Sequence, residues 1–398
     1  MKKSLFGYGV TTKALAKTAA PWDIYDDSFT TISTDAYGNT LMPPSAFDST
    51  QSTLEIPSPG FPLTHPLIRQ AQHLTSEYDY FFPQMPPSVW ISGTNGKTTT
   101  TQMLQYLLQD KGSQAGGNIG TPLALLDPKA SLWILETSSF TFHYTQQAFP
   151  NLYLLLPIKP DHLSWHGSFE AYESAKLKPL SMMKEGSVAI VPEEYANIPT
   201  KAMLITYEST AQLAQKLHID LKTINIKEPF LMDALLALGA QKILFGVPNI
   251  EAINHFKIDK HKLEEFYDRH GRLWVNDTKG TNIDATIEAL KRYQDREIHI
   301  VLGGDDKGVD LGRLFETIRP LHVTIYAIGS NTEKLVTLAH TVQTPVHACH
   351  TLKQAIPLMD AALKKEGVGL LSPAAASLDQ YTSYVARGEE FMTLVQKL

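Results

Sequence analysis

Apolar and polar residues alternate along the chain with two different periods. Short apolar runs typical of buried strands recur, at 4–6, 89–93, 132–136, 152–156 and 187–191. Residues 98–110 have helical spacing instead, with Met103, Leu104, Leu107 and Leu108 on one face. Strands that alternate with helices in this way predict α/β units built on parallel sheets.

The pattern restarts in the last third of the chain. Strand-like runs occur there, at 272–277, 298–304, 323–329 and 368–372, and a helical pattern covers 282–293. The proline-rich stretch 81–88 and the stretch 245–266 separate the strand-rich regions. We therefore predict three domains, at 1–86, 87–257 and 258–398.

A glycine-bearing turn between a predicted strand and a predicted helix has the residues of a phosphate-binding loop. The usual pattern G-x-x-x-x-G-K-[ST] requires a glycine where this chain has Ile91, so the glycine spacing is shortened to Gly93 and Gly96. Glycine lets backbone N–H groups close on phosphate oxygens, and the helix N-terminus adds positive charge. Lys97 supplies a point charge for the terminal phosphates and Thr98 a hydroxyl for Mg²⁺. The loop predicts a nucleotide site without choosing among a kinase, an ATPase and a ligase, and an ordinary turn with a surface lysine is the alternative.

The central region contains three further residues that could take part in chemistry. Glu136 ends a buried strand at the sheet edge where α/β proteins bind ligands, and a carboxylate there suits Mg²⁺ or its water. His162 lies just beyond the next strand and is a candidate metal ligand, although a lone histidine is more often a packed or surface residue. Lys176 lies on a predicted helix, and the residue by itself is expected to be a solvated surface lysine.

Three strand ends in the last region carry positive charge. Lys279 follows the first strand, Lys307 the second, and Arg387 lies beyond a third. Because parallel strands end at the same edge of a sheet, we expect these cations on one face. Such a face suits an anionic substrate that bears carboxylates.

The N-terminal region carries a weaker nucleotide signal. Gly7 and Gly9 fit the start of G-x-G-x-x-G, and Thr12 stands at the third glycine position. Asp26 and Asp27 end the next apolar run, where an acid can bind a ribose hydroxyl. These residues predict a nucleotide-like ligand without identifying it.

Composition narrows the class of protein. The 398 residues are 43% hydrophobic, which is enough for sizeable cores. The formal net charge of −6 gives no sign of a surface that binds polyanions. Cys349 is the single cysteine, which excludes an internal disulfide and fits a reducing cytosol. The N-terminus lacks the pattern of a signal peptide, and no apolar run is long enough to span a bilayer. We expect a cytoplasmic monomer that binds neither nucleic acid nor membrane.

Seven motifs occur in the order found in one enzyme family, namely GTNGKTTT, GNIGTPL, LETSSF, KPDHLSWHGSFEAYESAKLKPL, NDTKGTN, LGGDDKG and LSPAAASLDQY. With these motifs the chain resembles the ATP-dependent Mur ligases of peptidoglycan synthesis, a superfamily that includes folylpolyglutamate synthase. The resemblance spans nearly the whole chain and is weakest before Ser88. It implies an α/β fold with a Rossmann-like N-terminal domain that binds a UDP-sugar. It also implies a central P-loop-type ATPase domain with a parallel sheet. The last domain would be Rossmann-like and would bind an amino acid.

The motifs NDTKGTN and SPAAASLDQY look most like the members that add D-glutamate to UDP-N-acetylmuramoyl-L-alanine. The resemblance implies that the substrate carboxylate attacks the γ-phosphate of ATP to give an acyl phosphate. The D-glutamate amine then displaces phosphate, and an amide bond forms. The alternatives are another Mur-type or folylpolyglutamate-type amino-acid ligase and, from a different class, a P-loop NTPase or ATP-gated binding protein without ligation.

The resemblance assigns roles to residues by motif position. The ATP-binding residues would be Gly93, Thr94, Asn95, Gly96, Lys97, Thr98, Thr99, Lys262 and Asp277. One Mg²⁺ would be bound by Thr98 and Glu136, and a second by His162 and Lys176. The UDP-sugar would contact Val10, Thr11, Asp26, Asp27, Ser58, Gly60, Asn118 and His162. The D-glutamate face would consist of Lys279, Thr281, Lys307, Ser377, Leu378 and Tyr384. The catalytic residues would be Lys97, Glu136, His162 and Lys176, the last of them carbamylated and therefore anionic.

Several parts of the chain depart from the family pattern, among them one residue and one segment near the expected ATP site. Lys262 stands where an ATP-contacting arginine is usual, and a point charge does not reproduce a planar guanidinium fork. The segment 228–239 lacks the His-Asn-x-x-Asn run that usually precedes its helix, so no residue is assigned to adenine.

Overall fold

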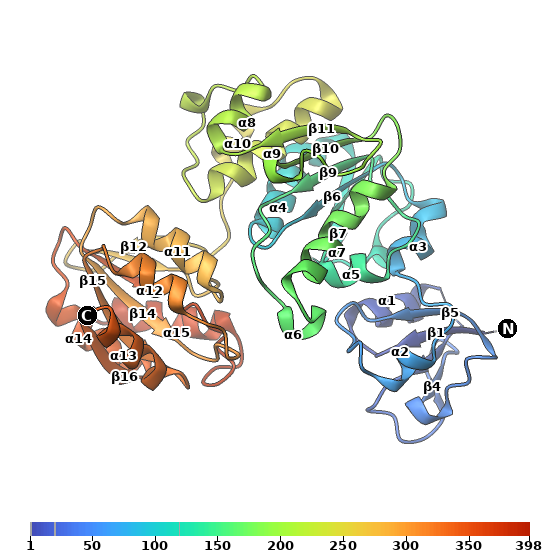
Figure 1. Cartoon of the computed structure of the whole chain (residues 1–398), viewed down its shortest axis with the longest axis horizontal. Coiled ribbons are helices and arrows are strands. Elements are labelled where there is room, and N and C mark those ends of the chain that lie inside the picture. The colour runs from blue at the N-terminus through green and yellow to red at the C-terminus, as the bar shows by residue number, and fades with distance from the viewer. Residues whose placement is uncertain (1, 20, 119) are drawn as a thin grey trace. The chain divides into compact units, whose positions relative to one another are not determined.

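The computed structural model describes residues 2–19, 21–118 and 120–398 and has a mixed α/β fold (Figure 1). The chain divides into two compact units, Met1–Phe256 and Lys257–Leu398. The first unit contains a five-stranded and a six-stranded sheet, and the second unit contains another six-stranded sheet. Within the described residues, no helix has the length and apolar character needed to cross a membrane.

The first sheet has the strand order β3-β4-β2-β1-β5 and is parallel except for the pair of β3 and β4. Its strands are β1 (Lys2–Phe6), β2 (Asp23–Tyr25), β3 (Ser33–Thr34), β4 (Thr40–Met42) and β5 (Ser52–Pro57). The helices of this region are α1 (Val10–Thr18) and α2 (Pro66–Gln70). The turn from β1 into α1 begins at Gly7, which has a φ of 80°. A Cβ atom at Gly7 would lie 3.0 Å from the Phe61 ring, so both the backbone conformation and the packing favour glycine.

The central sheet is entirely parallel, with the order β11-β10-β9-β6-β8-β7. Its strands are β6 (Ser88–Ser92), β7 (Ser113–Gly117), β8 (Leu132–Glu136), β9 (Leu152–Leu155), β10 (Val188–Pro192) and β11 (Met203–Tyr207). Its helices are α4 (Lys97–Leu108), α5 (Ser139–Tyr144), α6 (Leu163–His166), α7 (Phe169–Met182), α8 (Thr210–Lys216), α9 (Phe230–Phe245) and α10 (Ile250–His255).

The helices cover both faces of the central sheet because its crossovers run in opposite directions. The chain moves one way along the sheet from β6 through α4 to β7, and the other way from β8 through α5 to β9. Parallel crossovers are right-handed, so α4 and α5 lie on opposite faces. On these faces α4 packs against α9, and α5 packs against α7 (Figure 1).

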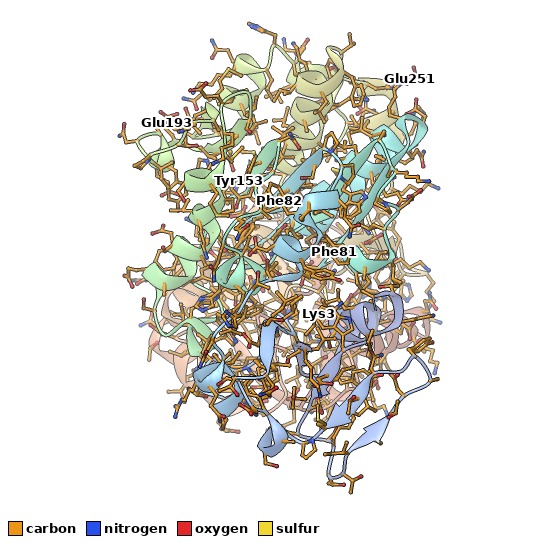
Figure 2. The ribbon with its side chains drawn as sticks, turned by 90° about the vertical axis from the view of Figure 1, so that its right-hand side faces the viewer. Lys3, Phe81, Phe82, Tyr153, Glu193 and Glu251 are labelled. Atoms are coloured by element: carbon orange, nitrogen blue, oxygen red, sulfur yellow. The ribbon has the colours of Figure 1, made fainter. Side chains whose placement is uncertain are left out.

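One hydrophobic core includes side chains from both sheets of the first unit. It contains Leu5 from β1 and Trp90 from β6, both fully buried. The helix α3 (Glu77–Phe81) carries the chain from the first sheet to the second, and Phe81 and Phe82 lie at this passage (Figure 2). The two sheets of this unit therefore share packed side chains as well as a covalent link.

The second unit has the strand order β12-β13-β17-β14-β15-β16 and is parallel except for β12. Its strands are β12 (Glu264–Tyr267), β13 (Leu273–Asn276), β14 (Ile298–Gly303), β15 (Val323–Ile328), β16 (Val346–His350) and β17 (Val368–Leu371). Its helices are α11 (Ile283–Arg292), α12 (Gly312–Ile318), α13 (Thr332–Thr341), α14 (Leu352–Ala362) and α15 (Tyr384–Gln396). The fully buried Trp274 pairs with Gly369 across β13 and β17. A Cβ atom at Gly369 would lie 2.4 Å from the Trp274 ring, so the missing side chain makes room for the indole.

Hydrogen-bonded ion pairs secure the amino end of this sheet. Arg272, directly before β13, donates from Nε to the Asp268 carboxylate at 2.7 Å. Its Nη2 bonds to the Asp360 carboxylate, and its Nη1 donates to the Asp360 carbonyl oxygen at 2.8 Å. The guanidinium therefore connects the start of β13 to α14.

The α/β fold class predicted from the sequence is confirmed, and the helices predicted at 98–110 and 282–293 correspond to α4 and α11. The strands that were not predicted include β3, β4, β5, β7, β11, β12 and β16. Glycine occupies two of the five positions in β7, and two histidines interrupt β16, so neither has a continuous apolar run. The division into domains at 86/87 and 257/258 remains a prediction.

We expect Gly369→Ala to lower the free energy of unfolding by about 1–3 kcal/mol, because the added methyl group would overpack the Trp274 indole. Denaturant titration would measure the change. Gly312→Ala is the control, because its methyl group would meet only the flexible Asp310 side chain, at 3.3 Å. Equal stability of Gly369→Ala and the wild type would contradict the packing argument.

Candidate active site

The phosphate loop turns sharply between β6 and α4. Gly93 and Gly96 have φ angles of 135° and 85°, which side chains disfavour. A Cβ atom at Gly93 would lie 2.4 Å from the Leu156 Cβ, just beyond β9. A Cβ atom at Gly96 would lie 2.3 Å from the Asp233 carboxylate on α9. The loop is therefore fitted closely against the neighbouring elements at both glycines.

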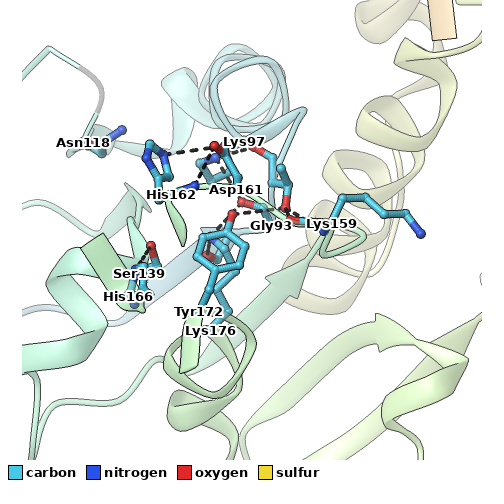
Figure 3. Close-up of polar contacts among 12 residues, drawn as sticks. Gly93, Lys97, Asn118, Ser139, Lys159, Asp161, His162, His166, Tyr172 and Lys176 are labelled. Carbon is cyan, nitrogen blue, oxygen red and sulfur yellow. Dashed lines mark hydrogen bonds and ion pairs between the residues drawn. The ribbon is translucent and has the colours of Figure 1, made fainter. Parts of the chain in front are cut away.

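Two lysines donate to the same carbonyl oxygen in this loop. Lys97 Nζ lies 3.0 Å from the Gly93 oxygen and 2.7 Å from the Thr94 oxygen. Lys176 Nζ, from α7, lies 2.8 Å from the Gly93 oxygen (Figure 3). Burial, followed by the Lys97 charge, lowers the pKa of Lys176 well below its ordinary value. Both effects favour the neutral amine of Lys176 more than in a solvated lysine.

The expectation from the isolated residue that Lys176 is a solvated surface lysine is wrong. Its exposed fraction is 1%, because α7 turns this position inward. Its Nζ atom lies 4.8 Å from the centroid of the Tyr172 ring. A lysine so deeply buried without a bonded carboxylate is rare, which marks the position as functional.

Glu136 lies between two other predicted site residues. Its exposed fraction is 3%. Thr98 Oγ1 donates to Glu136 Oε2 at 2.8 Å, and Asn118 Nδ2 donates to Oε1 at 2.8 Å. Both carboxylate oxygens are thus bonded to neutral groups, so the negative charge is available to a cation. The structure brings these three predicted residues together at the carboxyl end of β8.

His162 immediately precedes α6 and has a left-handed conformation, with a φ of 53°. Its backbone N–H donates to Asp161 Oδ1 at 2.8 Å, and its ring Nε2 lies 3.6 Å from Asp161 Oδ2. Figure 3 shows Asp161 and His162 beside Lys97, whereas the Lys159 side chain points away from this group. No cluster of three or more His, Cys, Asp or Glu side chains suited to a metal occurs in the described part of the chain.

Three residues near Lys176 and His162 were given no role by sequence reasoning. The Tyr172 hydroxyl lies 3.1 Å from Thr94 Oγ1, and His166 Nε2 lies 2.9 Å from Ser139 Oγ. Burial, followed by the charges of neighbouring histidines and Lys176, lowers the pKa of His166 to about 4. His166 is therefore neutral at physiological pH. Tyr172, His166 and Ser139 could have been singled out from the sequence, because they belong to the motifs that contain Lys176 and Glu136.

The N-terminal candidates gather at the turn between β1 and α1. Asp26 Oδ2 accepts the Tyr8 N–H at 2.6 Å. The Ser58 hydroxyl lies 3.3 Å from Thr12 Oγ1, and Val10 is 73% exposed at the start of α1. Asp26, Ser58 and the first residues of α1 therefore share one surface.

The other N-terminal candidates are Asp27, Thr11 and Gly60. Asp27 pairs with His65 at 3.3 Å, and Thr11 is the second residue of α1. A Cβ atom at Gly60 would meet open space.

The candidates of the second unit lie on the loops after β13, β14 and β17. Lys279 Nζ lies 5.6 Å from the centroid of the Tyr384 ring. Lys307, with a φ of 52°, donates its N–H to Asp305 Oδ1 at 3.0 Å. Backbone hydrogen bonds of 3.0 and 2.9 Å between Asp305 and Ala376 join the second loop to the third. The same three loops carry Thr281, Ser377 and Leu378.

Three residues of the second unit are more buried than a binding surface requires. Arg387 is 1% exposed, so the prediction that it presents its charge on this face is wrong. Asp277 accepts a hydrogen bond from Ser372 Oγ at 2.6 Å, and burial raises the pKa of Asp277 to about 7. Lys262 is 9% exposed and pairs with Asp259 at 3.3 Å.

The sequence is similar to those of known proteins. A family model described as the Mur ligase middle domain matches residues 91–230. A UDP-N-acetylmuramoylalanine–D-glutamate ligase from Campylobacter jejuni is 53% identical over 402 residues, covering 100% of both chains. A Helicobacter pylori protein of the same name is 43% identical over 421 residues, again covering 100% of both. The chain belongs to the Mur ligase family.

Solved Mur ligase structures share the fold of this family member. A MurF ligase from Thermotoga maritima in complex with ADP superposes with a TM-score of 0.57 and 16% identity, covering 87% of this chain and 88% of that one. A UDP-N-acetylmuramate–alanine ligase, MurC, from the same organism has a TM-score of 0.57 and 14% identity, covering 100% of both chains. At these identities the likeness shows the fold alone.

We expect Gly93→Ala to weaken ATP binding about tenfold or more, equivalent to about 1.4 kcal/mol, because the methyl group would clash with Leu156 and distort the loop. Isothermal titration calorimetry would measure the affinity. Gly186→Ala is a control for alanine at a positive φ: its φ of 85° also disfavours a side chain, but nothing lies within 4 Å of the added Cβ. Similar ATP affinities of both variants would show that the close fit at Leu156 has no part in nucleotide binding.

Proposed function

We propose that this Mur ligase uses ATP to join D-glutamate to UDP-N-acetylmuramoyl-L-alanine, a step in peptidoglycan precursor synthesis. One observation carries the proposal: full-length relatives at 53% identity have the name of this activity. The site supports it, since a phosphate loop with a buried acid lies in the first unit and a loop face with two lysines lies in the second. A nucleotide hydrolase alone does not need the second set of residues.

The reaction proceeds through two displacements. A carboxylate oxygen of the L-alanine residue attacks the γ-phosphorus of ATP, and the bond to ADP breaks to give an acyl phosphate. The D-glutamate amine then attacks the acyl carbon, loses a proton, and expels inorganic phosphate as the amide forms. Lys97 lies inside the loop and exchanges amide carbonyl partners for phosphate oxygens, which are stronger acceptors. Its charge offsets the negative charge that develops on the transferred phosphoryl group.

The oxygen atoms at the end of β8 fit a magnesium ion. Mg²⁺ prefers oxygen ligands and is commonly held by one or two carboxylates together with substrate phosphates. Glu136 and Thr98 supply such oxygens 2.8 Å apart, and the Glu136 charge has only neutral hydrogen-bond donors beside it. Bound there, Mg²⁺ neutralises charge on the phosphates of ATP.

A second magnesium ion fits His162 and a modified Lys176. A neutral lysine amine adds to carbon dioxide and releases one proton, which leaves an anionic carbamate. The low pKa of the buried Lys176 amine provides the required neutral form. The carbamate would replace a neutral amine with a group that shares one negative charge between two oxygens, beside the positive charge of Lys97 in the phosphate loop.

The substrates are assigned to two sets of loops. The UDP-sugar binds the N-terminal turn with Val10, Thr11, Asp26, Asp27, Ser58 and Gly60, and reaches Asn118 and His162. D-glutamate binds Lys279, Thr281, Lys307, Ser377, Leu378 and Tyr384, where two ammonium groups suit two carboxylates. ATP binds the phosphate loop at residues 93–99, whereas the assignment of the buried Lys262 and Asp277 to ATP remains a prediction. We also propose that the protein acts as a cytoplasmic monomer, which light scattering on purified protein will test.

We expect purified protein with ATP, Mg²⁺ and UDP-N-acetylmuramoyl-L-alanine to release phosphate when D-glutamate is added. Each candidate amino acid is added in turn, and phosphate is measured colorimetrically. Stimulation by L-lysine, diaminopimelate or L-alanine but not by D-glutamate would overturn the assignment. Phosphate release that is independent of every amino acid would favour a simple ATPase.

We expect Lys176→Ala to reduce activity by roughly 10- to 100-fold, the range typical of groups that support a metal site. Short carboxylates such as acetate should restore part of the rate, because they replace the anionic carbamate. Lys178→Ala is the matched control, since Lys178 lies on the same helix and donates to the Phe142 and His143 carbonyls instead. Full activity of Lys176→Ala, or a loss that no carboxylate relieves, would exclude the carbamate role.

A further inference from the structure

Arg387 lies beneath the loops that carry the proposed D-glutamate residues. It belongs to the first turn of α15, and 1% of its surface is exposed. Its Nε donates to Thr278 Oγ1 at 3.0 Å, and its Nη2 donates to the carbonyl oxygens of Thr278 at 3.0 Å and Ala375 at 3.1 Å. Its Nη1 donates to the carbonyl oxygens of Gly303 and Ala376, both at 3.4 Å. All five guanidinium N–H groups therefore have an acceptor.

These acceptors come from three separate segments of the chain. Thr278 follows β13, Gly303 ends β14, and Ala375 and Ala376 follow β17. The guanidinium thus bonds at once to the ends of the three strands whose loops form the candidate face. No other interaction described in the second unit joins all three.

The residues that Arg387 holds are next to candidate substrate residues. Thr278 immediately precedes Lys279, and Ala376 immediately precedes Ser377. A shift of either carbonyl group therefore moves the neighbouring side chain directly. Ala376 is also the backbone partner of Asp305, on the loop that carries Lys307.

The charge of Arg387 is offset by carbonyl dipoles and a hydroxyl. Four of its five hydrogen-bond acceptors are main-chain oxygens, and the fifth is the Thr278 hydroxyl. Burial lowers the pKa of Arg387 to about 10, while Tyr381 and Asp379 act in the opposite direction. The guanidinium is therefore still a cation at neutral pH, directly below a face that is proposed to bind carboxylates.

We propose that Arg387 is a positioning residue for D-glutamate: its guanidinium holds the three strand-end loops in one arrangement and so places Lys279, Ser377 and Lys307 for the amino-acid substrate. The inference rests on the proposed function. Binding groups must be held within about 0.5 Å of their working geometry, and loops reach that precision only when other groups lock them. A lysine has three donors on one atom, so it cannot span three segments as the planar guanidinium does.

Arg272 provides a matched control within the same unit. It is also buried and donates to several acceptors, but it lies at the amino end of β13, away from the loops that follow the strands. Loss of the Arg272 guanidinium should therefore lower the stability of the protein without changing how it recognises an amino acid. The comparison separates positioning of the loops from general stabilisation of the unit.

The experiment compares full-length wild-type protein with Arg387→Lys, Arg272→Lys and Thr278→Val, measuring phosphate release and thermal unfolding. We expect Arg387→Lys to raise KM for D-glutamate about tenfold or more while KM for ATP stays within about twofold. Thr278→Val removes the acceptor of Nε and should raise the same KM by a smaller factor. Arg272→Lys should lower the unfolding temperature and leave KM for D-glutamate unchanged. Millimolar guanidinium should restore part of the D-glutamate affinity in Arg387→Ala.

The outcomes distinguish the inference from the proposed function. If the wild type shows no D-glutamate-dependent phosphate release, the proposed function fails first. If the wild type is active but Arg387→Lys matches Arg272→Lys in every kinetic constant, Arg387 is only a stabilising residue and the inference is wrong. If Arg387→Lys does not fold, Thr278→Val decides: an unchanged KM for D-glutamate would refute positioning through this network.

Discussion

Much of the central site depends on one oxygen atom, the carbonyl oxygen of Gly93, to which two lysines donate. Ammonium groups that share an acceptor lie close together, and like charges in a buried position repel strongly. Burial lowers the pKa of Lys176 well below its ordinary value, and the charge of Lys97 acts in the same direction. Position therefore distinguishes the two lysines: the surroundings of Lys176 favour loss of its proton, whereas Lys97 belongs to the phosphate loop itself.

The loop conformation makes this arrangement possible. Gly93 approaches Leu156 so closely that its carbonyl group has little freedom to turn away from the lysines. The same sharp turn sets Thr98 at the start of α4, opposite Glu136 at the end of β8. The parallel order of β9, β6 and β8 thus brings three loops together that are far apart in the sequence. The sheet supplies the framework, and the glycine turn determines how its edge is used.

Sequence reasoning predicted the elements more reliably than the surroundings of individual side chains. Apolar runs identified β6, β8 and β9, because a buried parallel strand has no polar face to interrupt it. The shortened glycine spacing, with Glu136 at the end of β8, predicted a phosphate site. The burial of Lys176 was not predictable from the residue itself, since the side of α7 that faces inward is set by contacts with other elements, such as the Tyr153 hydroxyl of β9, which donates to the Lys176 carbonyl oxygen. Arg387 was misplaced for the same reason: clustering of cations in the sequence does not show which of them lies below the surface.

The way Arg387 contacts its neighbours has a consequence for the diversity of such enzymes. Four of its five bonds are to peptide carbonyl groups, which every residue possesses. Side chains on the strand-end loops can therefore be exchanged while the backbone remains anchored. At the opposite edge, Arg272 and the pairing of Trp274 with Gly369 maintain the sheet independently. A scaffold fixed through its peptide groups leaves the choice of amino acid to a few replaceable side chains, so new substrate preferences can arise without a new fold.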